Sequence, residues 1–451
     1  MRKILAFITA CIMAVINIIP AFAQSSDTIP ETTFRSYVVM DAATGQVLLE
    51  KEMDLKAYPA SITKILTTML ALENKSPDDQ IIISYEAVHS ILAGSTHIAL
   101  TEGEVITLRD ALYATMIQSA NDAANVAGEH TGGSLAAFAE MMNKRAAELG
   151  AVNTHFVNAN GLPHPDHYTT AYDMALITRA ALNVDGFRDY FGALLYTMPP
   201  TNKQTESRTF GTFHHMLVDS KYYYDGAVGG KLGWTEEAKH TIVTVAKRGD
   251  IELICVGMNT GSKWGKYSDT AKLFDYCFNN LKPFTLKGRD FEEFEVPVYE
   301  DDKSNPVYTA KISGAGSYSL LIHRDLDEDD VLSFKYNIPE YYSDPDKINP
   351  TVTIKLNDPN GRMVQSRARL PLEYELIPLA DGGTGASGIS MEGGFSLQKV
   401  KEICIVLLKV AGVMLGVLFV LLLIIRQINL YRYRKIREKM NRQQHRTRTR
   451  R

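Results

Sequence analysis

The segment "YPASITKILTTMLALE", residues 58–73, combines a helix start with a reactive pair of side chains. Its apolar residues recur at helical spacing behind Pro59, so a helix is predicted to open near Ser61. Ser61 and Lys64 are three residues apart, which places both side chains on one face of that helix. A serine hydroxyl becomes a good nucleophile when a neighbour takes its proton, and a desolvated lysine can do so. The same spacing also fits a capping serine beside a solvated lysine.

Two further short motifs carry side chains of the same chemistry. In "QSAND", residues 118–122, Ser119 and Asn121 are two apart in a break between helical segments and would face the same way if extended. In "KLG", Lys231 could fix a substrate carboxylate, and Gly233 would let a substrate backbone approach. Asn121 fits a helix cap equally well. A K-x-G motif on its own is not evidence for a substrate site.

The hydrophobic pattern around these motifs predicts a sheet with helices. Strand-like segments come first and last, and a long helical stretch lies between them, so one sheet is expected to be assembled from both ends of the region. The predicted elements are strands at 34–41, 46–50 and 241–259, the last with a hairpin turn at Gly249 and Asp250, and helical segments over 108–182 and from about 266 to 281.

Beyond Pro283 the helical pattern stops. Short strand-like runs separated by Gly, Pro, Asp and Asn predict a small all-β domain over 287–379. The segment 380–400 contains "DGGTGASGISMEGG" and is predicted to be a flexible linker, since it has few bulky residues to bury.

The two ends of the chain carry targeting and membrane signals. A basic start, an apolar run and small residues at Ala21 and Ala23 predict a signal peptide over 1–23 rather than an uncleaved anchor. Residues 403–425 are apolar except for Lys409 and predict a single transmembrane helix. The tail 426–451 has eleven Lys and Arg against one Glu, a net charge of +10. Since the whole chain carries −4, the rest of the chain carries −14. A cytoplasmic tail, a cell-membrane location and an extracytoplasmic catalytic region follow from the positive-inside rule, and nucleic acid is not an expected partner.

Cysteine and histidine usage suggests neither a disulfide nor a metal. Cys255 lies in a strand-like run and Cys277 in a helix-like run, so two buried thiols are favoured over a disulfide. His164, His167 and Tyr168 lack a third metal ligand in the sequence. No metal or cofactor is expected.

Taken together and in this order, S-x-x-K, S-x-N and K-x-G resemble the motifs of the penicillin-recognising serine acyltransferases. The segments "YPASITKILT", "MIQSANDAANVAGEHTGG", "HFVNANGLPHPDHYTTAYDMALI" and "DGAVGGKLGWTEEAKHTIVTVAKR" are similar to the D-alanyl-D-alanine carboxypeptidases, which are low-molecular-weight penicillin-binding proteins. The resemblance covers about 30–280 and implies an α+β fold over 30–283. This is the penicillin-binding/β-lactamase-like domain, an antiparallel sheet with helices on both faces.

The resemblance also implies an activity: removal of the terminal D-Ala from peptidoglycan stem pentapeptides through an acyl-enzyme, with β-lactams as covalent inhibitors. The implied roles are Ser61 as nucleophile, Lys64 as base, Ser119 as proton relay, Asn121 and Lys231 as substrate contacts, the backbone N–H groups of Ser61 and Trp234 as oxyanion hole, and Gly233 and Thr235 as further substrate-binding positions of the same strand.

Two departures from the family pattern leave alternatives open. Leu232 stands where the family usually has a threonine that helps hold the substrate carboxylate, a loss worth about ten- to 150-fold in rate. "FHHMLV", residues 213–218, replaces a stretch that usually contains Asn, and Tyr222 to Tyr224 and Trp234 are either cleft contacts or packing residues. A D,D-endopeptidase, a β-lactamase and a weakly active or inactive regulatory protein of the cell wall therefore remain as competing hypotheses.

Overall fold

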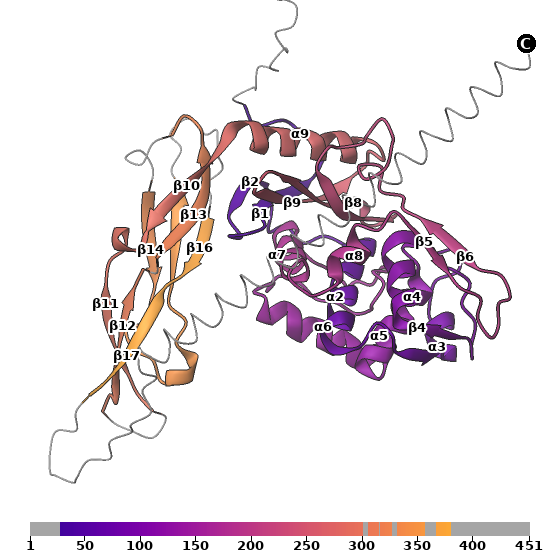
Figure 1. Cartoon of the computed structure of the whole chain (residues 1–451), viewed down its shortest axis with the longest axis horizontal. Helices are drawn as coiled ribbons and strands as arrows, with labels where there is room; N and C mark the ends of the chain where they lie inside the picture. Colours follow the sequence, from indigo (N-terminus) through magenta and orange to yellow (C-terminus); the bar gives the residue numbers. More distant parts are fainter. Residues whose placement is uncertain (1–27, 301–304, 315, 327–331, 357–366, 380–451) are drawn as a thin grey trace, which may run out of the picture. The chain divides into compact units, whose positions relative to one another are not determined.

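A five-stranded antiparallel sheet lies at the centre of the N-terminal region in the computed structural model (Figure 1). The strand order is β2-β1-β9-β8-β7, so two strands from the start of the region lie beside three from its end. The prediction of one sheet assembled from both ends is therefore confirmed. The strands are β1 (Ser36–Asp41), β2 (Val47–Lys51), β7 (Ala227–Thr235), β8 (Lys239–Arg248) and β9 (Ile251–Thr260). The structure describes residues 28–300, 305–314, 316–326, 332–356 and 367–379.

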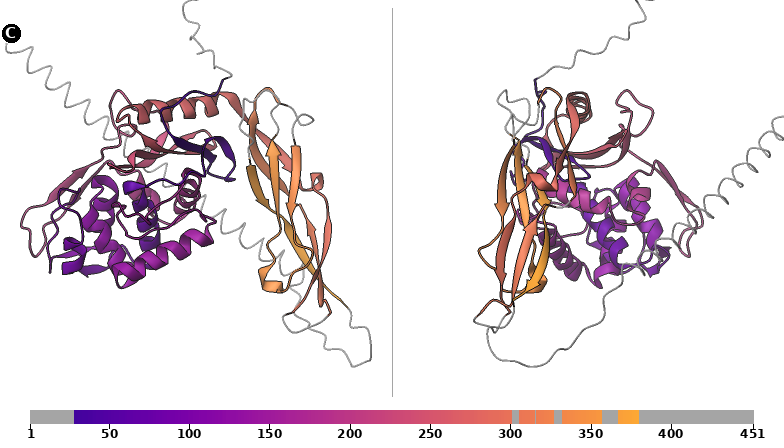
Figure 2. Two further views of the ribbon diagram at one scale, coloured as in Figure 1. Left: turned by 180° about the vertical axis from the view of Figure 1, so that it is seen from behind. Right: turned by 60° about the vertical axis from the view of Figure 1, so that its left-hand side comes forward.

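Alternate residues of the strands enter two different hydrophobic cores. In β1, Val38 and Met40 pack with the helices of one face, whereas Tyr37 and Val39 pack with helix α9 on the other. Figures 1 and 2 show α9 along one face of the sheet and the remaining helices on the opposite face. The predicted α+β fold is confirmed. The helices are α2 (Lys64–Asn74), α3 (Tyr85–His89), α4 (Leu108–Tyr113), α5 (Asn121–Gly132), α6 (Leu135–Glu148), α7 (Ala171–Ala181), α8 (Phe187–Phe191) and α9 (Gly265–Asn280).

The predicted hairpin between the last two strands is also present. β8 ends at Arg248 and β9 begins at Ile251, so Gly249 and Asp250 form the turn. Gly249 has a φ of +57°, a conformation that glycine adopts at low cost. Two small two-stranded sheets were not predicted, because their strands are short and lack alternating apolar residues. They are β3 (Gln80–Ile82) with β4 (Val105–Thr107), and β5 (Leu195–Met198) with β6 (Arg208–Gly211).

The chain after α9 is rich in strands, as predicted. Their apolar side chains share a separate core that includes Val298, Ile312 and Ile354. Strands β10 and β16 were not predicted as separate strands, because both contain a proline and the second also contains two arginines. The strands form the sheets β11-β12-β17, β14-β15-β16 and β10-β13, with bounds β10 (Leu281–Lys287), β11 (Phe294–Val298), β12 (Tyr308–Ser313), β13 (Ser317–His323), β14 (Leu332–Asn337), β15 (Thr351–Leu356), β16 (Arg367–Pro371) and β17 (Glu373–Pro378).

The two regions are joined without an intervening loop. β10 begins at Leu281, immediately after α9, and so spans the predicted boundary between 283 and 287. Gln46, between β1 and β2, donates a hydrogen bond to the carbonyl of Leu321 (2.6 Å) and accepts one from its amide (2.7 Å). This paired contact fixes β13 against the sheet of the N-terminal region. The domain limits 30–283 and 287–379 stay predictions.

Several predicted segments lie outside the described residues: the signal peptide 1–23, the linker 380–400, the transmembrane helix 403–425 and the tail 426–451. Among the described helices, none combines the length and the apolar character needed to cross a membrane. The two cysteines between the predicted signal peptide and the predicted transmembrane helix are described. Cys255 in β9 and Cys277 in α9 are both buried and unbridged, which confirms the prediction of free thiols.

Candidate active site

Ser61 and Lys64 lie side by side at the start of α2. Ser61 belongs to a short 3₁₀ helix, Ala60–Thr63, and α2 continues directly from Lys64. The Lys64 side-chain nitrogen is 2.9 Å from Ser61 Oγ. The prediction that both side chains share one face is confirmed.

The surroundings of Lys64 favour its uncharged form. The side chain is fully buried, and its Nζ also contacts Asn121 Oδ1 (2.7 Å) and the carbonyl of Asn160 (2.5 Å). Burial and the nearby charge of Lys231 lower its pKa well below the usual value, against an opposing effect of Asp122. A neutral amine keeps two N–H donors for Asn121 and Asn160, which leaves its lone pair for the Ser61 hydroxyl.

Ser119 and Asn121 reach the site from the break between α4 and α5. A π-helical turn, Ala114–Gln118, ends at Ser119, whose φ of +61° is left-handed. Asn121 then opens α5 and is almost fully buried. The two side chains contact different lysines, because Ser119 Oγ accepts from Lys231 Nζ at 2.8 Å while Asn121 accepts from Lys64. The break therefore joins the two lysines into one polar network.

Lys231 extends from β7, the edge strand, to complete this network. It is 3 % exposed, and its Nζ donates to Ser119 Oγ and to the carbonyl of Leu232. Burial, with a smaller contribution from the charge of Lys266, lowers the pKa of Lys231 to about 7. The three sequence motifs, distant along the chain, thus meet within hydrogen-bonding distance.

The residues after Lys231 bring β7 against the 3₁₀ helix. A Cβ on Gly233 would lie 2.3 Å from Thr241 Oγ1 and 2.9 Å from Ser61 N, so only glycine allows this approach. Trp234 is 57 % exposed and lines the cleft beside Ser61. Thr235 accepts a hydrogen bond from Ala238 N (3.0 Å) and so stabilises the turn into β8.

A cleft of about 650 Å³ opens in front of Ser61 and Ser119. Its lining includes Phe213 and His215 of the "FHHMLV" segment. It also includes residues that the sequence did not single out, because they carry no motif: Thr96, His240, Lys263, Trp264, Lys266 and Tyr267.

One wall of the cleft is aromatic. Tyr222 stacks on Trp264 with ring centroids 5.4 Å apart, and His215 packs edge-on against both rings. Of the other two tyrosines, Tyr223 is exposed and Tyr224 donates to Asp275 (2.9 Å). The "FHHMLV" segment therefore does shape the cleft.

Lys266 and Leu232 also line the cleft. Lys266, at the start of α9, is 5 % exposed and its Nζ lies 5.1 Å from the Tyr267 ring centroid. Burial lowers the pKa of Lys266 to about 8, helped by the charge of Lys263. Leu232 lines the same cleft and packs with the apolar residues around α9. The cleft is thus lined by both an apolar side chain and a cation.

The "NANG" stretch, interpreted from the sequence as a structural turn, also contacts the site. The carbonyl of Asn160 accepts from Lys64, and the Asn160 side chain donates to Asn125 Oδ1 (2.8 Å). His167 is buried with Nε2 3.0 Å from Thr63 Oγ1, and burial lowers its pKa to about 3. In the part of the chain that the structure describes, no group of three or more His, Cys, Asp or Glu residues is placed to hold a metal.

Comparisons with known proteins agree with this geometry. The sequence model of a family described as D-alanyl-D-alanine carboxypeptidase, peptidase S11, matches residues 23–262. The chain is 28 % identical over 299 residues to the D-alanyl-D-alanine carboxypeptidase DacF of Bacillus subtilis, with 66 % of this chain and 74 % of the relative covered. It is also 28 % identical to DacD of Escherichia coli, with 66 % and 78 % covered.

Two solved structures give the same picture. The D-alanyl-D-alanine carboxypeptidase of Mycobacterium tuberculosis superposes with a TM-score of 0.52 at 28 % identity, covering 57 % of this chain and 95 % of that one. DacD of Francisella tularensis, at 22 % identity, has a TM-score of 0.56 and covers 78 % and 96 %. The second likeness shows the fold alone, and it extends into the β-rich region.

Proposed function

The chain belongs to the D-alanyl-D-alanine carboxypeptidase family of serine peptidases, and from this premise we propose which of its residues perform the reaction. As a serine-type D-Ala-D-Ala carboxypeptidase, it acts on peptides that end in D-Ala-D-Ala and binds β-lactams. The observation that carries the proposal is the network in which Lys64 contacts Ser61 and Asn121 while Lys231 contacts Ser119.

Acylation begins at Ser61. Neutral Lys64 takes the proton of the Ser61 hydroxyl as Oγ attacks the carbonyl carbon between the two D-Ala residues. The carbonyl oxygen becomes an oxyanion, and the backbone N–H groups of Ser61 and Trp234 stabilise it. The close approach of Gly233 to Ser61 N supports this placement of the two donors.

Ser119 carries a proton to the leaving group. When the peptide bond breaks, the amine of the terminal D-Ala needs a proton, and the Ser119 hydroxyl supplies it while receiving one from the lysine network. Free D-Ala then leaves. In the second half of the reaction, Lys64 takes a proton from water, the hydroxide attacks the ester carbon, and the proton returns to Ser61 Oγ.

Two lysines are proposed to bind the terminal carboxylate. Lys231 is at the network, and Lys266 lines the cleft on the side of α9. Both are nearly fully buried, so an anion placed between them would interact strongly with each. Lys266 adds a cationic contact at the cleft in which Leu232 contributes no hydroxyl.

Covalent trapping tests the nucleophile. Ser61→Ala should abolish labelling by a fluorescent penicillin and leave the thermal unfolding of the full chain unchanged, because Lys64 has no other hydroxyl partner in the described structure. Peptide mapping of the labelled wild-type chain should place the acyl group on Ser61. A stoichiometric label that persists in the Ser61→Ala variant would contradict the assignment.

We further propose that the protein is a single-pass protein of the cell membrane. The apolar segment 403–425 would cross the membrane, and the basic tail 426–451 would lie in the cytoplasm. The catalytic region and the β-rich region, limited to 30–283 and 287–379, would then lie outside the cell, joined to the membrane by the linker 380–400. The support for this topology is the distribution of charge and hydropathy along the sequence.

A further inference from the structure

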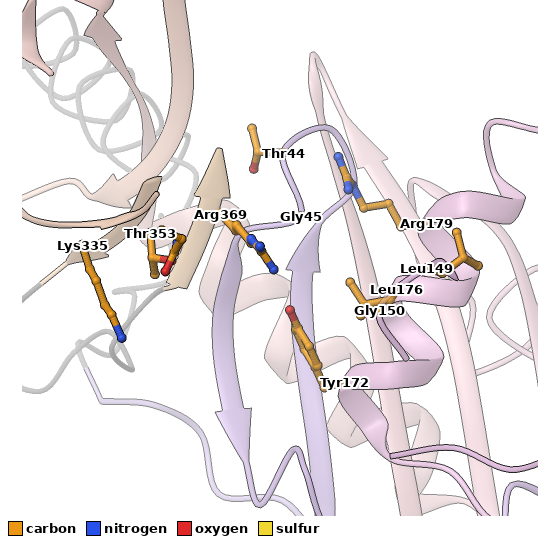
Figure 3. Close-up of a pocket in the computed structure, with 11 residues that line it drawn as sticks. Thr44, Gly45, Leu149, Gly150, Tyr172, Leu176, Arg179, Lys335, Thr353 and Arg369 are labelled. Carbon is orange, nitrogen blue, oxygen red and sulfur yellow. The ribbon is translucent and has the colours of Figure 1, made fainter. Parts of the chain in front are cut away.

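A second cavity, of about 520 Å³, lies away from the active-site cleft. It is lined by the β1–β2 turn and α7 on one side and by β14, β15 and β16 on the other (Figure 3). It shares no lining residue with the cleft. β2 and β7 form opposite edges of the central sheet, so the turn before β2 is far in the strand order from the strand that carries Lys231.

The lining of this cavity is positively charged. Arg179 of α7, Lys335 of β14 and Arg369 of β16 all contribute, and none of the lining residues is acidic. Within the described ranges, none of the three pairs with a carboxylate. In Figure 3, Arg369 and Tyr172 extend from opposite walls into the same space. Three like charges around one cavity repel one another unless an anion lies among them.

Neutral acceptors hold the two guanidinium groups in place. Arg179 donates through Nε to the carbonyl of Ala42 (2.9 Å) and through Nη2 to that of Ala43 (2.8 Å). Arg369 donates through Nε to Thr351 Oγ1 (3.0 Å). Each guanidinium has five N–H donors, so both keep donors for a further partner. The groups are positioned without being neutralised.

The nearest carboxylate on the β1–β2 turn is already engaged. Asp41 is 6 % exposed, and its Oδ2 accepts from the backbone N (2.8 Å) and the hydroxyl (2.6 Å) of Thr44. It therefore stabilises the turn and does not line the cavity.

We propose that this cavity binds a phosphate-bearing ligand with at least two anionic groups. Arg179 comes from one wall and Lys335 and Arg369 come from the other, so an anion between the walls would meet cations from two sides. A tetrahedral phosphate offers acceptors in several directions, whereas a planar carboxylate offers two, and guanidinium groups match phosphate geometry well. A bound ligand joins α7 to the β-rich region and thereby holds the two regions together.

Titration of the full chain in neutral detergent micelles with inorganic tripolyphosphate tests the site. Calorimetry should show saturable binding that weakens as salt is added, because exposed charges are screened. Arg369→Glu and Lys335→Glu should each weaken binding about tenfold or more, as expected for loss of a charge-assisted contact. Lys203→Glu is the matched control, since Lys203 is an exposed lysine of the β5–β6 loop outside the cavity, and it should change affinity less than about twofold.

Further titrations identify the chemical class and the source of the phosphate ligand. Phosphatidylglycerol added to the micelles competes with tripolyphosphate if a lipid headgroup enters the cavity, and fails to compete if the site takes soluble phosphate only; both results retain a phosphate site. Absence of saturable binding, equal weakening by Lys203→Glu, or citrate binding as tight as tripolyphosphate would each overturn the proposal. Penicillin labelling of Arg369→Glu should equal that of the wild type, so this test is independent of the active site.

Discussion

Burial is the main cause of the chemistry of the Lys64 side chain. A charged lysine in a dry site is costly, and its three hydrogen-bond partners here are neutral oxygens of Ser61, Asn121 and Asn160. The neighbouring Lys231 adds repulsion to that cost. The lowered pKa of Lys64 is therefore a direct result of where the helix places it.

The pH dependence of acylation should reflect three lysines. Lys64 must be neutral to act as base, whereas Lys231 and Lys266 must be charged to hold the carboxylate. Because their pKa values are lowered to about 7 and about 8, these two cations lose their protons as the pH rises through that range. The second-order rate of acylation by a carboxylate-bearing β-lactam should therefore fall above about pH 7, and this rate reports the free enzyme.

Lys266→Arg separates the two contributions. Arginine stays charged over the whole pH range. In a plot of the logarithm of the acylation rate against pH, the wild type should therefore decline with a slope steeper than −1, and the Lys266→Arg variant with a slope no steeper than −1. A wild-type rate that stays level through pH 9 would show that neither cation holds the carboxylate.

The structure shows what the Leu232 side chain contacts in the cleft. It lines the cleft and packs in the apolar cluster around α9, to which Tyr222 and Tyr267 also belong. We expect the missing hydroxyl to weaken carboxylate binding and the apolar packing of the leucine side chain to stabilise this part of the cleft. The net effect of Leu232 on turnover depends on which of these two contributions is larger.

Leu232→Thr should raise carboxypeptidase turnover by about tenfold or more on a peptide with a free carboxylate, because a hydrogen bond to a charged group is worth at least ~1.5 kcal/mol. Leu232→Val is the matched control, since valine has the shape of threonine without the hydroxyl. It should give no gain, and a C-terminally amidated peptide should show little benefit from threonine. If threonine leaves the rate unchanged or lowers it, leucine is an adapted part of this cleft.

At the level of elements, the 3₁₀ helix that carries Ser61 depends on a distant glycine. Ala60 has a φ of +51°, and its carbonyl packs directly on Gly161, whose own φ is +87°. A Cβ on Gly161 would lie 2.0 Å from the Ala60 oxygen. The turn after Asn160 thus positions the backbone immediately before the nucleophile.

Gly161→Ala should therefore lower the free energy of unfolding by about 2–5 kcal/mol, combining left-handed strain with overpacking, and should slow penicillin labelling. Gly133→Ala provides the control. Gly133 also has a positive φ, +80°, but a Cβ there meets nothing within 4 Å, so only the strain of about 1–2 kcal/mol applies. Chemical denaturation of both variants measures the difference, and equal losses would contradict the packing argument.

At the level of the whole molecule, the catalytic region is connected to the β-rich region without a loop. β10 follows α9 directly, and the Gln46 contacts to Leu321 tie β13 to the sheet. Both regions end before the predicted linker 380–400. The proposed membrane segment 403–425 would follow this linker.

Protease treatment of intact cells stripped of their wall tests that topology. Added protease should digest the regions 30–283 and 287–379 and spare an epitope on the tail 426–451, because the membrane shields the cytoplasmic side. Permeabilised cells, in which both parts are digested, provide the control. Protection of the catalytic region together with loss of the tail epitope would reverse the proposed orientation.

Much of this protein was determined by local sequence. Hydrophobic periodicity was sufficient for β1, β2, the β8–β9 hairpin and α9, because strands and helices record which face is buried. The spacing of Ser61 and Lys64 fixed their contact, since three residues along a helix make a pair of neighbours. Motif order then indicated the family.

Only the tertiary structure decided the contacts between motifs and the composition of the cleft. Lys231 meets Ser119, and Asn160 meets Lys64, across 112 and 96 residues of chain, a proximity that no local pattern records. The aromatic wall and Lys266 come from loops and a helix start without periodicity. The lowered pKa values depend on burial, which exists only once the chain has folded.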